Sequence, residues 1–181
     1  MPPTRFKPYE NERRPTRQSL VLIGGDGNGY DYSEKDWYRL AFEFKNISST
    51  FINSKRTPQF AWQNLKENSG PEHKHLDTEN TDLQLFTKNL DEHSHIFVTA
   101  DSTTRISEII SRGYFINVIE MKGPIQYEMH HDFMQSLQEK GLLKIMRLDE
   151  LHLSENKYHG NVKKFVVTER DALKSKLTKL L

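Results

Sequence analysis

The regular alternation of short apolar runs with helical stretches is the feature that most limits the fold of this chain. Apolar runs typical of buried strands lie at 19–23, 50–53, 96–99 and 115–119, and a helical pattern follows each of them. In such chains a helix connects successive parallel strands through a right-handed crossover. We therefore predict an α/β fold, a Rossmann-like parallel sheet with helices on both faces.

Capping and stop signals mark the helix boundaries. Ser33 and Asp36 form a capping box that starts a helix reaching about Asn46, and Pro58 starts the next one. Gly113 stands where the helix at 102–112 ends. The helix after Pro58 is predicted to face inward with Phe60, Ala61 and Leu65. A short strand at 74–76 and helices at 83–90, 130–139 and 169–181 complete the prediction, the last with Leu173, Leu177 and Leu180 aligned.

The first 18 residues differ in composition from the rest of the chain. Residues 1–18 are rich in Pro and Arg and lack an apolar run, so we predict a flexible basic arm. The remaining 19–181 are predicted to form a single Rossmann-like domain, because a chain of 181 residues is short for a two-domain enzyme.

Composition excludes several classes of function. Lys and Arg number 26 against 25 Asp and Glu, so no overall charge draws the chain to nucleic acid or to an anionic membrane. No run approaches the roughly 20 apolar residues that span a bilayer. The chain has no cysteine, hence neither disulfides nor thiolate nucleophiles. Because the N-terminus is polar and unlike a secretory signal, a cytoplasmic location is expected.

Three polar turns follow predicted strands, at 24–29, 54–57 and 100–104. The carboxyl ends of parallel strands meet at one edge of a sheet, and ligands of such folds bind beyond that edge. We therefore expect the three turns to share a ligand.

The stretch 98–108 is the strongest candidate for binding a phosphate. An apolar strand runs into a hydroxyl-rich turn that opens a helix, and a helix start offers unpaired N–H groups and partial positive charge. Ser102 to Thr104 are predicted to bind the phosphate. The alternative is that Asp101 to Thr104 act only as helix-capping residues, although capping explains one of these hydroxyls and not all of them. Arg56 is predicted to grip phosphate oxygens, with Lys55 the weaker candidate. Glu108, two turns into the helix, would reach a sugar hydroxyl.

Two other motifs argue against a cofactor or a metal. The glycines at 25, 27 and 29 do not fit G-x-G-x-x-G, which disfavours a nicotinamide site. The loop containing Gly24 and Gly25 is explained equally well by a turn that needs positive φ angles and by a close approach to phosphate. The eight histidines lack the spacing of a metal site and are expected to be solvated. We predict neither a metal nor a cofactor.

Three motifs in order along the chain resemble a known family. Leu22-Ile-Gly-Gly25, Asn53-Ser-Lys-Arg-Thr-Pro58 and Val98-Thr-Ala-Asp-Ser-Thr-Thr-Arg-Ile-Ser-Glu108 resemble the C-terminal half of the mitochondrial fission Elm-type family, over roughly 20–151. Bacterial members of that family are often labelled nucleoside-diphosphate-sugar epimerases. The family is similar to the nucleotide-binding half of GT-B glycosyltransferases.

The resemblance implies that the ligand is a nucleotide or nucleotide-sugar. By motif, Gly24 and Gly25 would approach the diphosphate, Ser102 to Thr104 would bind it at the helix start, Arg56 would add a further contact, and Glu108 would hold the ribose. An opposing N-terminal domain is the expected partner and is absent from this sequence, so catalytic residues stay unassigned. Lys55-Arg56 replaces an arginine pair of the family, and Asp26 brings a carboxylate close to the expected diphosphate.

Two functions follow from these observations. The first is a nucleotide-sugar binding domain of a GT-B-like glycosyltransferase or of a nucleoside-diphosphate-sugar epimerase. The second is a catalytically inactive protein-interaction module that retains the fold.

Overall fold

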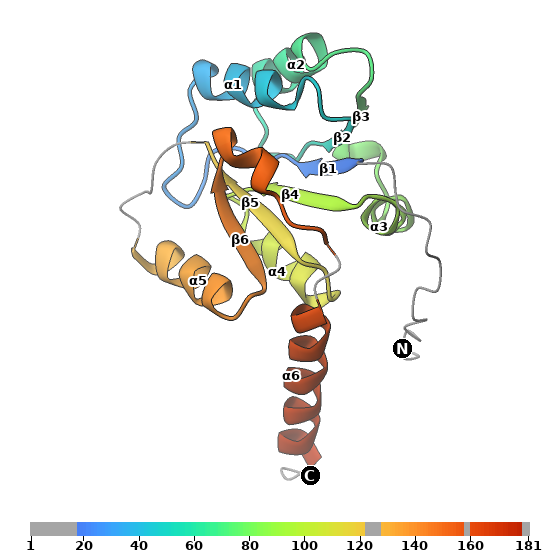
Figure 1. The fold of residues 1–181 in the computed structure, drawn as a ribbon, viewed down its shortest axis with the longest axis vertical. Helices are drawn as coiled ribbons and strands as arrows, with labels where there is room; N and C mark the ends of the chain where they lie inside the picture. The colour runs from blue at the N-terminus through green and yellow to red at the C-terminus, as the bar shows by residue number, and fades with distance from the viewer. Residues whose placement is uncertain (1–17, 122–127, 158–159, 179–181) are drawn as a thin grey trace.

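In the part of the chain that the structure describes, six strands form one parallel sheet in the order β3-β2-β1-β4-β5-β6 (Figure 1). The computed structural model describes residues 18–121, 128–157 and 160–178. The strands are β1 (Ser19–Leu22), β2 (Ser49–Ile52), β3 (Lys74–Leu76), β4 (His95–Thr99), β5 (Ile116–Glu120) and β6 (Leu143–Arg147). This is the strand order of the Rossmann fold, so the predicted fold class is confirmed.

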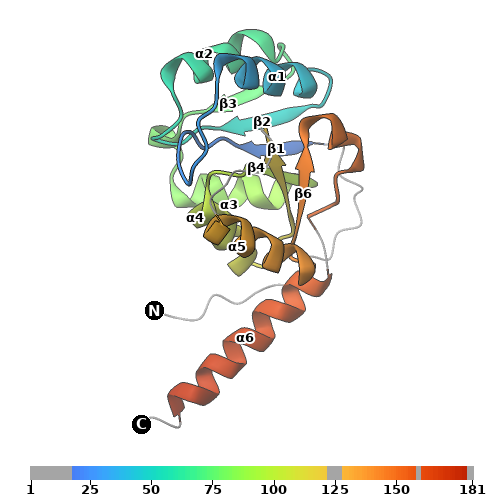
Figure 2. The same ribbon diagram turned by 90° about the vertical axis from the view of Figure 1, so that its left-hand side faces the viewer.

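Helices cover both faces of the sheet. They are α1 (Glu34–Phe44), α2 (Gln59–Asn68), α3 (Leu83–Glu92), α4 (Thr103–Ser111), α5 (Glu128–Glu139) and α6 (Gly160–Thr178), with short 3-10 helices η1 (Thr78–Asn80) and η2 (Leu148–Leu153). Figures 1 and 2 show α1 and α2 on one face and α3, α4 and α5 on the other. Within the described residues, no helix combines the length and the apolar character needed to span a bilayer.

The two central strands are buried on both faces, which explains their continuous apolar runs. Aromatic side chains fill the layer between the sheet and α1. The Phe44 ring lies 5.8 Å from that of Phe51 and 5.2 Å from that of Phe97, both edge to face. Trp37 is fully buried on the same helix. This packing fixes the central strands and therefore the turns that follow them.

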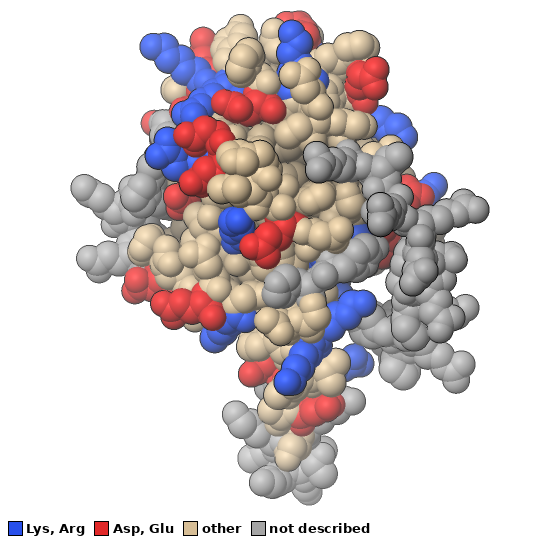
Figure 3. All heavy atoms as spheres, viewed as in Figure 1, with Lys and Arg blue, Asp and Glu red and all other residues tan. Residues whose placement is uncertain are grey.

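The surface carries no dominant charge on the face that Figure 3 shows, where basic and acidic side chains are interspersed. Figure 2 shows α6 projecting away from the body of the domain. Of the described side chains of α6, Val162 is buried, while Val167 is exposed. The side chains of Leu173, Leu177 and Leu180, whose alignment was predicted, lie outside the described residues. The predicted arm lies outside them as well, up to residue 17.

Most predicted elements are present, and four details are wrong. α6 begins at Gly160, nine residues before the predicted start at 169, and β6 has no predicted counterpart. Phe60 is half exposed, because the inward face of α2 is instead formed by Ala61, Trp62, Asn64 and Leu65. The histidines expected to be solvated include three buried ones, His73, His93 and His130.

Candidate functional site

A cavity of about 340 Å³ lies at the carboxyl edge of the sheet. It stands beside β1, where the chain order reverses between β2 on one side and β4 on the other. Residues from all three predicted turns line it together, among them Gly24, Arg56 and Ser102. Such a reversal point is where open α/β sheets place their ligands.

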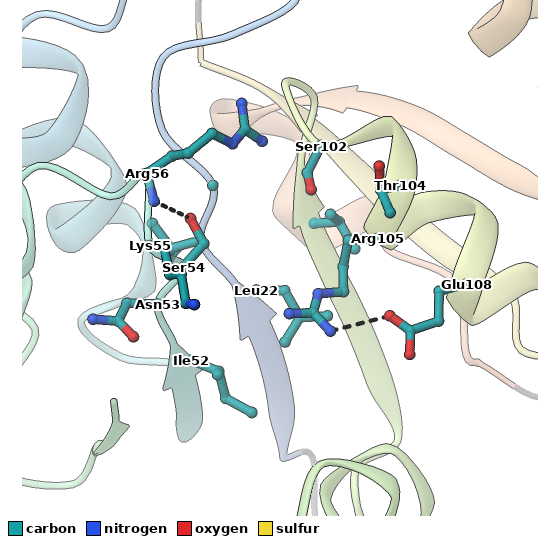
Figure 4. A pocket seen from close by; sticks show the side chains of 13 residues that line it. Leu22, Ile52, Asn53, Ser54, Lys55, Arg56, Ser102, Thr104, Arg105 and Glu108 are labelled. Atoms are coloured by element: carbon teal, nitrogen blue, oxygen red, sulfur yellow. Dashed lines mark hydrogen bonds and ion pairs between the residues drawn. The ribbon is translucent and has the colours of Figure 1, made fainter. Parts of the chain in front are cut away.

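The floor and the walls of the cavity differ in chemistry. Leu22 pairs in register with Ile52 on one side and with Val98 on the other, so the three side chains form an apolar floor. Figure 4 shows the turn after β2, with Lys55 and Arg56, facing the first turns of α4 across this floor. The cavity therefore offers apolar surface below and charged groups at its rim.

The glycine loop after β1 is held by contacts within the protein. The N–H of Gly24 donates to the Thr99 hydroxyl at 2.8 Å, and the N–H of Gly25 donates to Asp101 at 2.9 Å. A Cβ at Gly24 would stand 2.0 Å from an Asp101 carboxylate oxygen, and a Cβ at Gly25 would stand 2.0 Å from the Arg56 carbonyl oxygen. Gly29 of the same loop has a positive φ angle of 83°, as the explanation from turn conformation requires, but Gly24 and Gly25 do not, so that explanation is wrong for these two. Close packing accounts for these two glycines.

Asp101 is the central buried group of the site, and the sequence suggested only a capping role for it. Its side chain is fully buried, and Oδ2 accepts from the Gly25 N–H and from Arg56 Nη2 at 3.0 Å. Burial raises the pKa of Asp101, while hydrogen bonds from Thr99 and Gly25 and the charge of Arg56 act in the opposite direction. Asp101 thus ties the first turn to the second.

Arg56 is oriented by two contacts and still reaches solvent. Nη1 donates to the Asp26 carbonyl oxygen at 2.9 Å, Nη2 donates to Asp101, and the side chain is 45% exposed. The Asp26 carboxylate accepts from the Tyr32 N–H at 3.3 Å within its own loop. Among the described residues, the remaining N–H donors of the Arg56 guanidinium have no protein acceptor, and they lie at the cavity rim.

The start of α4 keeps its donors open. Ile106 is the first residue whose N–H bonds back to the N-cap, donating to the Ser102 carbonyl oxygen at 3.0 Å, and the Ser102 side chain makes no capping bond. In the part of the chain that the structure describes, the N–H groups at 103–105 therefore have no helical acceptor. Ser102 and Thr104 line the cavity, whereas Thr103 faces away from it toward the Asn28 amide.

Glu108 lies in the cavity wall between two arginines. Its oxygens accept from Arg105 Nη1 at 3.1 Å and from Arg112 Nη2 at 3.2 Å, and its side chain is one-third exposed. Both guanidinium groups lie over the Phe86 ring, at 4.5 and 5.9 Å from its centre. Arg105 lines the cavity and was not predicted. Its spacing from Ser102 and Glu108, three residues each way, is the signal that identifies it.

The structure thus places five of the seven predicted site residues at one cavity. These are Gly24, Arg56, Ser102, Thr104 and Glu108, while Gly25 and Thr103 lie outside its lining. Among the described residues, no group of three or more His, Asp or Glu is arranged to hold a metal ion.

Comparison with known proteins gives a family and one similar structure. The family model described as "Mitochondrial fission ELM1" matches residues 5–169, most of the chain. No curated protein matches the sequence. The crystal structure of Acinetobacter baumannii MurG is similar with a TM-score of 0.48 and 12% sequence identity, over 91% of this chain. This chain spans 50% of the MurG chain.

Proposed function

Because the chain belongs to the mitochondrial fission ELM1 family, we propose that its cavity binds a nucleoside diphosphate, either free or conjugated to a sugar. In this proposal the chain supplies the nucleotide-binding domain of a GT-B-like glycosyltransferase or of an epimerase-like protein. One observation carries it. The cavity at the reversal point of the sheet combines an open helix start, three cationic side chains and a carboxylate.

Each part of a nucleoside diphosphate has a counterpart in the cavity. The phosphates fit the start of α4, where the helix dipole and the unpaired N–H groups favour an anion. Lys55 and Arg56 face that point from the turn after β2. The base fits the apolar floor, and the ribose hydroxyls fit the Glu108 carboxylate. In a transfer reaction the same cations would offset the charge of the departing diphosphate.

A thermal-shift screen with the diphosphates of the four ribonucleosides and their sugar conjugates tests this proposal. A ligand that binds the native state raises its apparent stability, so a shift with one base identifies the nucleotide. If none of these compounds shifts the unfolding temperature or binds by calorimetry, the proposal is wrong.

Replacing Glu108 with Ala separates the ribose contact from the phosphate contacts. We expect E108A to weaken binding of the nucleoside diphosphate by about tenfold, because a charged hydrogen-bond acceptor is lost. Binding of inorganic pyrophosphate should persist, because Arg105 is then released from its carboxylate partner. Glu92→Ala is the control, since Glu92 forms a similar helical ion pair, with Lys88, on α3. Equal losses for both ligands would contradict the ribose assignment.

A second candidate is a protein-interaction module that keeps the fold without binding nucleotides. The observation that favours it is the set of contacts between Asp101, Arg56 and Gly25, which gives these motif residues a structural role in the absence of any ligand. If this candidate is correct, no nucleotide will shift the unfolding temperature. Substitutions of the arginines at 13–17 will then impair function more than E108A does.

A further inference from the structure

A second cavity, of about 400 Å³, lies on the other side of the first turn of α4. It is open to solvent and is bordered by that turn, by Asn28 from the glycine loop and by the start of α5. Thr104 lines both this cavity and the first one. The open start of α4, where we place the phosphates, therefore stands between two cavities.

The second cavity differs from the first in charge. No Lys, Arg, Asp or Glu is among its lining residues in the described chain, whereas Lys55, Arg56, Arg105 and Glu108 line the first cavity. His130 adds no charge near neutral pH. Burial lowers its pKa, and its Nε2 donates to the Ala100 carbonyl oxygen at 2.8 Å. Among the described lining residues, an ionic ligand would find no side chain of opposite charge.

The two walls of the second cavity are chemically distinct. The α4 wall presents the hydroxyls of Thr103, Thr104 and Ser107, each able to donate and to accept. The α5 wall presents Met129, which is 77% exposed, and Phe133, which is partly buried. A large apolar side chain with that exposure has surface available to cover a ligand.

We infer that the second cavity binds a neutral, polyhydroxylated group, a sugar, attached to the distal phosphate of the nucleotide. This inference rests on the proposed function. Sugar hydroxyls match the hydroxyls of the α4 wall, and the C–H face of a sugar ring packs against Met129 and Phe133. The size of the cavity is within the usual range for small-molecule sites.

The test compares binding of each nucleoside diphosphate with binding of its glucose conjugate by calorimetry. For the diphosphate that binds, we expect the conjugate to bind about tenfold more tightly to the unaltered chain. Ser107→Phe fills the second cavity from an exposed position of α4 and should remove this advantage while leaving the affinity for the plain diphosphate unchanged. Ser111→Phe, one turn further along the same helix and outside the cavity lining, should alter neither affinity.

The outcomes distinguish this inference from the function on which it rests. If a diphosphate binds and its glucose conjugate binds no better, the inference is overturned while the proposed function stands. The inference is also overturned if S107F weakens both ligands equally. Binding of neither ligand overturns both.

Discussion

The glycine loop and the start of α4 both border the cavity, and they use their backbone donors in opposite ways. The N–H groups of Gly24, Gly25 and Gly27 all donate to acceptors within the protein. The N–H groups at 103–105 have no helical acceptor in the described chain. Proximity to the site therefore does not by itself make a motif a ligand contact.

This difference changes the roles that the family resemblance implied. The space beside the Cα atoms of Gly24 and Gly25 is filled by Asp101 and by the backbone of Arg56. A diphosphate would compete with those groups at the loop, but it meets open donors at α4. We therefore expect the glycine loop to determine stability and the start of α4 to determine binding.

Gly24→Ala should produce the largest effect on stability. The new Cβ would stand 2.0 Å from a carboxylate oxygen of the fully buried Asp101, which hydrogen bonds from Gly25 and Arg56 hold in place. We expect the free energy of unfolding in urea to fall by about 3 kcal/mol, the upper range for overpacking. Gly160→Ala is the matched control, because its Cβ would meet nothing within 4 Å. A stable G24A variant that loses only nucleotide binding would contradict the comparison.

Asp101→Asn tests the electrostatic state of the loop through the pH dependence of stability. Burial raises the folded-state pKa of Asp101 above its ordinary value of 3.8. In the pH window between these two values, the folded protein therefore binds more protons than the unfolded chain. Stability from this group therefore falls as pH rises from 3.8 through the raised pKa. Asn does not titrate, so in urea unfolding the stability of the variant relative to the unaltered chain should increase with pH over that window.

Asp132 is exposed, and Asp132→Asn serves as the control for this pH series. Its stability should follow that of the unaltered chain at each pH. Parallel pH profiles for the unaltered chain and D101N would mean that Arg56 and the Gly25 N–H fully offset the burial of the carboxylate.

The sequence alone was sufficient to predict the central strands, but it did not predict β6 or the start of α6. β1 and β4 are buried on both faces and give unbroken apolar runs, whereas β6 is an edge strand interrupted by Lys144 and ending at Arg147. The first half of α6 carries β-branched residues, Val166 to Thr168, that favour helices weakly. Local pattern therefore missed the partly buried β6, although the edge strand β3, also partly exposed, was predicted at its observed bounds.

The positions of the site turns were predictable, but the contacts within the site were not. Parallel topology brings the three turns to one edge, which the alternation of elements already implied. The contact between Asp101 and Gly25 joins residues 76 positions apart, and no local pattern contains it. Asp101 is consistent with a capping residue in sequence, yet its carboxylate points into the glycine loop. Whether a polar group of the site is hydrogen-bonded within the protein is therefore determined by three-dimensional packing and not by the local sequence.

Thr104→Glu should have the smallest effect on stability and should separate stability from binding. The first turn of α4 carries no acidic residue, and a carboxylate there interacts favourably with the helix dipole. Because Glu108 stands one turn further along the helix and repels the new carboxylate, we expect the free energy of unfolding to change by less than about 0.5 kcal/mol. Because Thr104 lines the cavity, the same carboxylate should repel the phosphates and weaken nucleotide binding by at least about tenfold. Ser111→Glu, in the last turn, should cost about 0.5 kcal/mol and leave binding unchanged. Unaltered nucleotide affinity in T104E would move the phosphate site away from α4 and back to the glycine loop.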